Sequence, residues 1–253
     1  MKYYSTMPPP GIRPRWGHPH TRGLAAAWLF NTEKGWAVND VARGRTGVLS
    51  GANWSWQHRQ YGGGIFFGSN DKVTPSMSPV AGTIAGSYFA IVAGIVPNSI
   101  VGWHSIIGGQ NLFGTNGGKV AYYNSALVGA TALVVGTPYV VGITAGIGTS
   151  NESRVYLNGQ PDCALGTVAL GRGPAADWVI GNDAFNEYWN GVISFVYLYL
   201  NVLPSAAWHA DIAARPFDMF APVSRTMLTA SLFVTGSPVP IFDQYYRRMR
   251  SAA

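Results

Sequence analysis

Short runs of apolar residues, separated by glycine-rich turns, recur from residue 24 to about residue 215. Val, Ile, Tyr, Phe and Trp dominate these runs, and these residue types favour pleated strands. The pattern predicts strands at residues 25–30, 64–67, 88–96, 119–127, 139–145, 153–157, 178–180 and 192–200. Asn116-Gly117 and Asn158-Gly159 each predict a hairpin, because a type I′ turn needs positive φ at both central residues.

One segment, residues 204–214, has the pattern of a short helix. Ser205 is a suitable N-cap, Trp208 and Ile212 are one turn apart, and Pro216 ends the helix. The other segments are strands joined by turns, without helices between them. Such strands pair antiparallel, so the sequence predicts an all-β antiparallel β-sandwich with one short helix.

The two ends of the chain differ from the body between them. Prolines at positions 8, 9, 10, 14 and 19 interrupt residues 1–23, and four more interrupt residues 216–253. Proline disfavours both helix and central strand. The sequence therefore predicts an N-terminal arm (1–23), a β-sandwich (24–215) and a C-terminal extension (216–253).

Charge is sparse and unevenly distributed. Charged residues make up 11% of the chain, against about 25% in average soluble proteins. Residues 1–23 and 215–253 together hold nine basic and two acidic side chains, a net +7, while the body sums to −1. This pattern predicts that the ends dock onto an acidic partner surface; solvated basic tails are the alternative. We do not expect nucleic acid as the partner, because the basic run at residues 247–250 is short.

Several segments, in chain order, resemble motifs of the laminin-G-like branch of the concanavalin-A-like superfamily. They are residues 23–30 (GLAAAWLF), 39–51 (NDVARGRTGVLSG), 61–73 (YGGGIFFGSNDKV), 139–144 (YVVGIT) with 154–159 (RVYLNG), 179–181 (VIG) with 189–193 (WNGVI), and 203–205 (LPS). The resemblance covers residues 23–214 and implies a jelly-roll β-sandwich. Ser194 and Phe195 stand where the family has acidic residues, so a calcium site does not transfer directly.

A second resemblance concerns residues 214–222 (ARPFDMFAP), which are similar to the segment that follows such domains in tailed-phage structural proteins. It implies a non-enzymatic virion structural protein that decorates a capsid or tail in multiple copies or as a homo-oligomer. Such a protein is made in the host cytoplasm, without a signal peptide. The candidate docking residues are Arg13, Arg15, Arg22, Phe217, Phe220, Arg247, Arg248 and Arg250.

Aromatic residues near turns support an alternative function, a glycan-binding adhesion module. Trp103, Tyr188 and Trp189 lie beside polar residues, where a ring can stack on a sugar face. A third alternative, a glycoside hydrolase, needs two carboxylates about 5 to 9.5 Å apart. The chain has three glutamates, widely separated in sequence, so we do not expect an enzyme.

The sequence offers few candidate metal ligands and no apolar run as long as a membrane helix. Asp71 and Asp183 are weak candidates for calcium, since each follows an asparagine in a predicted loop. Local hydrogen bonding within the turns is the simpler interpretation of both residues. We therefore expect no cofactor, with calcium left open. The apolar runs are also shorter than the roughly 20 residues that a membrane helix needs.

Overall fold

The structure is a computed structural model of the whole chain. It describes residues 7–31, 35–51, 53–55, 63–68, 70–75, 88–108, 113–122, 127–146, 152–168, 178–182 and 187–222, with residues 53–55 as backbone only. A first compact unit ends at Val223. The second unit, Ser224–Ala253, lies outside the described residues.

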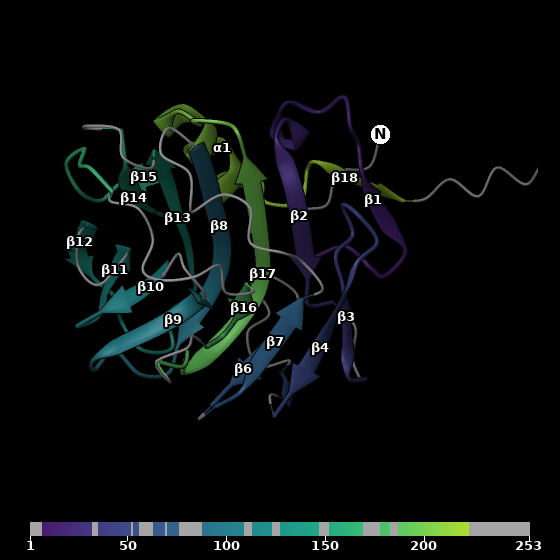
Figure 1. Cartoon of the computed structure of the whole chain (residues 1–253), viewed down its shortest axis with the longest axis horizontal. Coiled ribbons are helices and arrows are strands. Elements are labelled where there is room, and N and C mark those ends of the chain that lie inside the picture. The colour runs from purple at the N-terminus through teal and green to yellow at the C-terminus, as the bar shows by residue number, and fades with distance from the viewer. Residues whose placement is uncertain are drawn as a thin grey trace, which may run out of the picture. The chain divides into compact units, whose positions relative to one another are not determined.

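Two antiparallel sheets form the body of the first unit (Figure 1). The front sheet has the order β12 (Leu127–Ala132), β11 (Lys119–Tyr122), β10 (Phe113–Asn116), β9 (Trp103–Gly108), β16 (Val179–Ile180), β7 (Lys72–Pro75), β4 (Thr46–Ser50), β3 (Ala37–Asn39). The back sheet has the order β15 (Gln160–Pro161), β14 (Arg154–Leu157), β13 (Tyr139–Gly146), β8 (Tyr88–Pro97), β17 (Gly191–Leu200), β6 (Gly64–Phe67), β5 (Asn53–Ser55). A further strand, β2 (Leu24–Leu29), pairs with β17. The predicted antiparallel β-sandwich is confirmed.

The hairpin predictions differ in accuracy. Asn158 and Gly159 have φ of 48° and 78° and join β14 to β15, as predicted. In the β10–β11 hairpin, Asn116 pairs with Lys119, so the two central residues are Gly117 and Gly118, one position later than predicted. The single strand predicted at residues 119–127 is wrong: β11 and β12 are separate antiparallel strands there.

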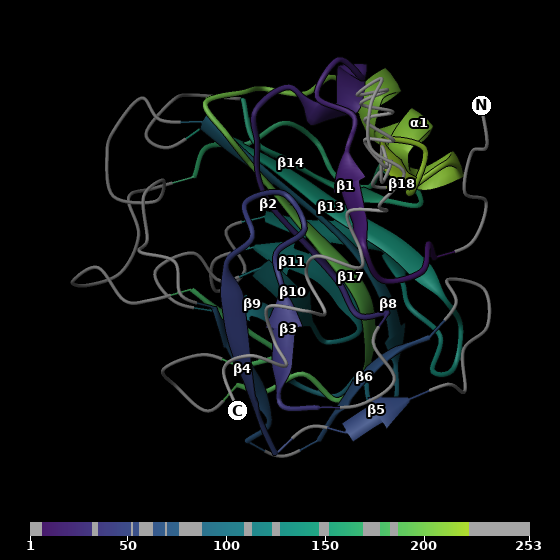
Figure 2. The same ribbon diagram turned by 90° about the vertical axis from the view of Figure 1, so that its right-hand side faces the viewer.

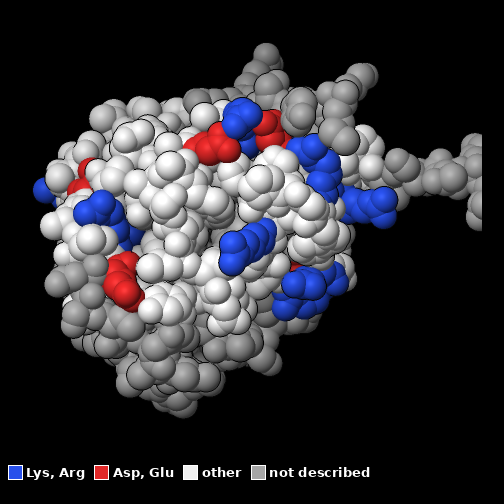
Figure 3. Space-filling view, turned by 90° about the horizontal axis from the view of Figure 1, so that it is seen from above, with Lys and Arg blue, Asp and Glu red and all other residues white. Residues whose placement is uncertain are grey.

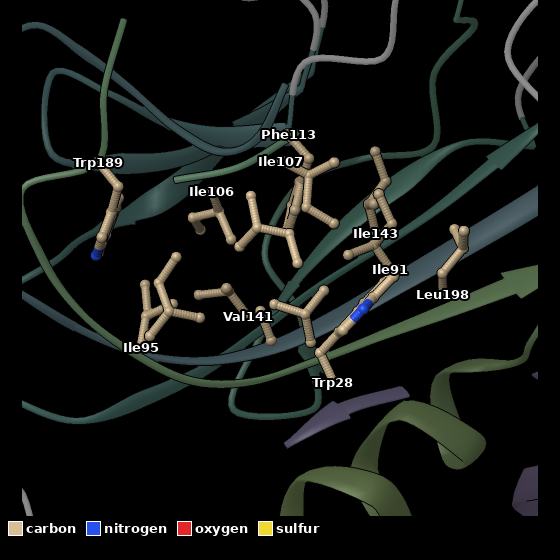
Figure 4. Packing of buried hydrophobic residues seen from close by; sticks show 14 of the residues in the cluster. Trp28, Ile91, Ile95, Ile106, Ile107, Phe113, Val141, Ile143, Trp189 and Leu198 are labelled. Carbon is tan, nitrogen blue, oxygen red and sulfur yellow. The ribbon is translucent and has the colours of Figure 1, made fainter. Parts of the chain in front are cut away.

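The main core fills the space between the two sheets. Alternate residues of the long back-sheet strands point into it, among them Ile91 and Ile95 of β8 and Val141 and Ile143 of β13. Figure 4 shows these side chains facing Ile106, Ile107 and Phe113 of the front sheet, with Trp189 at one end of the layer.

A second core covers the opposite face of the back sheet. Phe195, Tyr197 and Tyr199 of β17 point into it, next to side chains of β2 and β8. Three elements supply the cover: β1 (Ile12–Pro14), β18 (Phe220–Pro222) and the helix α1 (Ala206–Ala214). Figures 1 and 2 show β1 and β18 next to each other, and in Figure 1 they lie beside β2.

The two predicted arms are therefore part of the folded unit as far as the structure describes them. β1 and β18 pair antiparallel, with Ile12 opposite Pro222 and Pro14 opposite Phe220. Described residues of both predicted terminal segments, 1–23 and 216–253, thus pack onto the sandwich through β1 and β18. The physical reason is the apolar outer face of the back sheet, which water would otherwise contact.

The helix α1 agrees with its prediction. Ser205 is the N-cap, and its side chain accepts a hydrogen bond from the Trp208 amide. His209 is buried: its ring stacks on Tyr156 with 3.7 Å between centroids, and its Nε2 is 2.8 Å from Thr144 Oγ1. Glycine is needed at position 142, since a Cβ there would lie 2.9 Å from His209 Nδ1. No helix among the described residues is long and apolar enough to cross a membrane.

Substituting Phe220→Ala tests the second core. Because Phe220 is buried, we expect the free energy of unfolding to fall by about 3 to 5 kcal/mol. Arg13→Ala is the matched control, since Arg13 lies exposed on the paired strand β1, and it is expected to change stability by about 0.5 kcal/mol or less. Urea unfolding of the full chain measures both. Equal effects of the two substitutions would contradict this packing.

His209 predicts a pH dependence of stability. Burial lowers its pKa from 6.5 to about 3, so the folded state keeps the neutral ring while the unfolded state takes up a proton below pH 6.5. Stability from this residue is complete above pH 6.5 and decreases as the pH falls towards 3, by about 1.4 kcal/mol per pH unit. His209→Gln removes this titration. We expect the stability advantage of the unmodified protein to shrink between pH 6.5 and 4; parallel pH profiles would contradict the assignment.

Candidate functional site

A cleft of about 790 Å³ lies between the N-terminal segment and the turn that leads into α1. On the side of the N-terminal segment, the cleft is lined by Trp16, His18 and Arg22. On the side of the turn, it is lined by Asn201 and Trp208. We call it the Trp16–Trp208 cleft. Its residues come from positions almost 200 apart in the sequence, and the second core brings them together.

A short 3-10 helix, η1 (Pro19–Thr21), shapes the N-terminal side of the cleft. The His18 side chain caps it by accepting a hydrogen bond from the His20 amide at 3.2 Å. The Thr21 hydroxyl donates to the His18 carbonyl oxygen at 2.7 Å. These local bonds hold the chain in a tight turn, so that Trp16 and Arg22 both border the same cleft.

Contacts between η1 and α1 fix the two sides relative to each other. The His20 ring packs edge-on against Trp208 at 5.7 Å between centroids, and its Nε2 lies 2.9 Å from Asp211 Oδ2. Next to them, Gly23 has φ of +75°, and a Cβ at this position would lie 2.5 Å from Val202. Glycine thus permits the close approach of the two chain segments at one end of the cleft.

The two tryptophan rings differ in their surroundings. Trp16 is 52% exposed, and the Arg43 guanidinium lies 5.1 Å from the centroid of its ring. Trp208 is half-buried and packs edge-on against Tyr199 at 4.7 Å, which fixes its orientation on the second core. The cleft therefore offers one rigid ring and one accessible ring.

Some charged side chains around the cleft form ion pairs, and others do not. Asp211 pairs with Arg215, and Asp218 lies 3.4 Å from the same guanidinium. Arg22, in contrast, is exposed and has no side-chain partner within the part of the chain that the structure describes. Figure 3 looks down on the α1 end of the unit and shows basic side chains (blue) spread over this face, with fewer acidic ones (red).

The histidines beside the cleft are predominantly neutral at pH 7. Burial lowers the pKa of His20, and this outweighs the opposing effect of the Asp211 carboxylate. Burial, followed by the Arg15 charge, lowers the pKa of His18. His18 therefore contributes a hydrogen-bonding ring, and Arg22 contributes the permanent positive charge.

The predicted glycan-binding residues lie elsewhere, on and under the front sheet. Trp103 is half-buried, and its indole nitrogen lies 3.3 Å from Ser105 Oγ. Tyr188 is also half-buried and bridges to the backbone of Ser105. Trp189 has no exposed surface and packs in the main core beside His104, at 6.3 Å between rings. A buried ring has no free face, so the assignment of Trp189 to a glycan site is corrected.

The predicted docking residues differ in their surroundings, and only some of them are exposed. Arg13 is exposed on β1, whereas Arg15 donates a hydrogen bond to the Asp218 carbonyl oxygen. Phe217 and Phe220 are buried in the second core and contact the back sheet of their own chain, which corrects their assignment to a docking surface. Arg247, Arg248 and Arg250 lie outside the described residues.

The weak calcium candidates do not come together among the described residues. Asp71 accepts a hydrogen bond from the Gly68 amide at 2.7 Å, as in a local turn. Asp183 lies outside the described residues. In the part of the chain that the structure describes, no three His, Cys, Asp or Glu side chains form a group that fits a metal ion.

No model of a protein family matches the chain, and no curated protein matches it. Solved structures do resemble it. Trypanosoma rangeli sialidase in complex with the inhibitor DANA has a TM-score of 0.56 and 16% identity, over 77% of this chain and 33% of that chain. The chain thus spans about one third of the length of the sialidase.

A second similar structure is domain 4 of AbnA, an extracellular arabinanase of the GH43 class from Geobacillus stearothermophilus, solved in complex with arabinotriose. Its TM-score is 0.55 at 12% identity, over 75% of this chain and 98% of that domain. At these identities, the two similarities establish a shared β-sandwich fold.

Proposed function

We propose that the protein is a non-catalytic carbohydrate-binding module that holds a saccharide in the Trp16–Trp208 cleft. The observation that carries the proposal is the composition of this cleft: two tryptophans accompanied by an arginine, a histidine and an asparagine. Its volume of about 790 Å³ lies within the range of known ligand sites.

Aromatic and polar groups in one cleft suit a saccharide. A sugar ring has an apolar face of C–H groups, which an indole ring can cover, and hydroxyls at its edge, which need hydrogen-bonding partners. Trp16 and Trp208 offer the rings, while His18, Arg22 and Asn201 offer donors and acceptors. A purely apolar ligand would leave these polar groups without partners.

The positions of the carboxylates support the non-catalytic part of the proposal. Glycosidases of the usual kind need two of them across the scissile bond. The described residues that line the cleft include no aspartate or glutamate. Asp211 and Asp218, on and after α1, share Arg215 in ion pairs, which suits a structural role.

The shared fold supports the proposal independently. The AbnA domain, of nearly the same extent as the matched region, was solved with arabinotriose. Fold similarity alone does not assign a ligand. It does support a saccharide as the ligand class to test, since a domain of this fold was solved with one.

Attachment to a virion through the chain ends stays a prediction from the sequence. Of the residues that we expected to dock, two phenylalanines belong to the second core. Arg13 and Arg22 stay available at the surface, and the C-terminal arginines lie outside the described residues. A module that binds saccharides is compatible with such an attachment.

Trp16→Ala tests the cleft. We expect at least a tenfold loss of affinity for saccharides found on a glycan array, about 1.4 kcal/mol, because a stacking ring is removed. Stability is expected to change little, since Trp16 is 52% exposed. Isothermal titration calorimetry with the full chain gives the affinities.

Two matched substitutions serve as controls. Trp36→Ala removes a 72% exposed tryptophan that does not line the cleft, and it should leave affinity unchanged. Trp103→Ala probes the front sheet instead. A loss of affinity in Trp103→Ala without one in Trp16→Ala would move the site to the front sheet, and the absence of any saccharide ligand would refute the proposed function.

A further inference from the structure

We infer that the Trp16–Trp208 cleft selects acidic saccharides, those that carry a carboxylate or sulfate group. The inference rests on the proposed function, since it assigns a ligand class to the same cleft. It depends on a separate observation, the imbalance between free and paired charges around the cleft.

Arg22 is the centre of the argument. It lines the cleft, is exposed, and has no side-chain partner among the described residues. A guanidinium that lines a binding cleft and has no side-chain partner among the described residues is available to donate hydrogen bonds to an anion. Arginine binds carboxylate and sulfate oxygens through two parallel N–H donors, which gives both affinity and orientation.

Arg43 adds a second positive charge at the cleft. Its guanidinium lies 5.1 Å from the Trp16 ring centroid and donates a long hydrogen bond, 3.4 Å, to the Leu24 carbonyl oxygen. Neither partner is acidic, so its charge is not neutralised there. A saccharide stacked on Trp16 would therefore contact a ring that already has a cation at its face.

The acidic side chains near the cleft are engaged in ion pairs with arginines other than Arg22 and Arg43. Asp211 and Asp218 pair with Arg215, and Asp40 pairs with Arg45 at 2.8 Å. Asp40 is fully buried and also accepts hydrogen bonds from the amides of Ala27 and Ala42. These ion pairs stabilise the fold, and among the described residues none of them includes Arg22 or Arg43.

Binding of matched saccharide pairs tests the selectivity. Tetragalacturonate is compared with its uncharged methyl ester, a sulfated galactan tetrasaccharide with its desulfated form, and a broad glycan array extends both comparisons. We expect the acidic member of at least one pair to bind tenfold more tightly or better. The two pairs distinguish carboxylate from sulfate as the group that is recognised.

Substitution of the arginine assigns the effect to the cleft. Arg22→Gln removes the charge and keeps a polar side chain, and should reduce affinity for the acidic ligand at least tenfold while leaving its neutral partner unchanged. Arg13→Gln is the matched control, since Arg13 is exposed but does not line the cleft. Raising the ionic strength from 0.05 to 0.5 M should weaken acidic binding equally in the unmodified protein and in Arg13→Gln, and less in Arg22→Gln, which has lost one of the two positive charges at the cleft.

The outcomes separate the two proposals. Binding of neutral saccharides with no preference for acidic ones would overturn the selectivity and leave the proposed function intact. The absence of any saccharide ligand would overturn both. Equal affinity for a single-stranded oligonucleotide, with the same loss in Arg13→Gln as in Arg22→Gln, would mean a general attraction for polyanions and would also overturn the selectivity.

Discussion

The burial of β17 on both of its faces is the constraint on which the rest of the structure depends. In an ordinary two-layer sandwich, each sheet turns one face to the core and the other to water. Here Ile193, Val196 and Leu198 point between the sheets, while Phe195, Tyr197 and Tyr199 point away from them. Three large aromatic side chains on an outer face need a cover, and each is worth roughly 2 to 3 kcal/mol when it is removed from water.

The two ends of the first unit provide that cover. The segment before β2 and the segment after β17 are the parts of the chain nearest to this face, because β2 and β17 pair with each other. Their strands β1 and β18 then complete each other's hydrogen bonds. The Tyr197 hydroxyl donates to the Pro216 carbonyl oxygen at 3.0 Å, so the cover also satisfies a polar group that would otherwise be buried alone. The cleft follows from this arrangement, as the space left where the two covering segments meet beside α1.

Local sequence signals predicted the elements that depend on local interactions. Ser205 and Pro216 bound the helix correctly, and Asn158-Gly159 located a hairpin, since capping and positive φ are properties of a few neighbouring residues.

The cleft was not predictable in this way, because its sides become neighbours only through the second core. One signal did exist: residues 192–200 are apolar without alternation, apart from Ser194, which is typical of a strand buried on both faces. That signal would have assigned Phe217 and Phe220 to a cover. The burial of Trp189 had no such signal, because its neighbours in sequence do not distinguish a buried ring from an exposed one.

The same constraint changes the meaning of the positive charge at the N-terminal end. Basic residues in a solvated arm would attract any acidic surface, with little selectivity. Once the segment is folded, its arginines have different surroundings. Arg15 bonds to the backbone beside β18 and serves the fold, whereas Arg22 is presented at a cleft that also contains two indole rings. Under the proposed function, this guanidinium and the neighbouring indole rings would together recognise an anionic group attached to an apolar face. Under that proposal, folding of the basic N-terminal segment onto the back sheet gives its positive charge a particular class of ligand, which a solvated arm would lack.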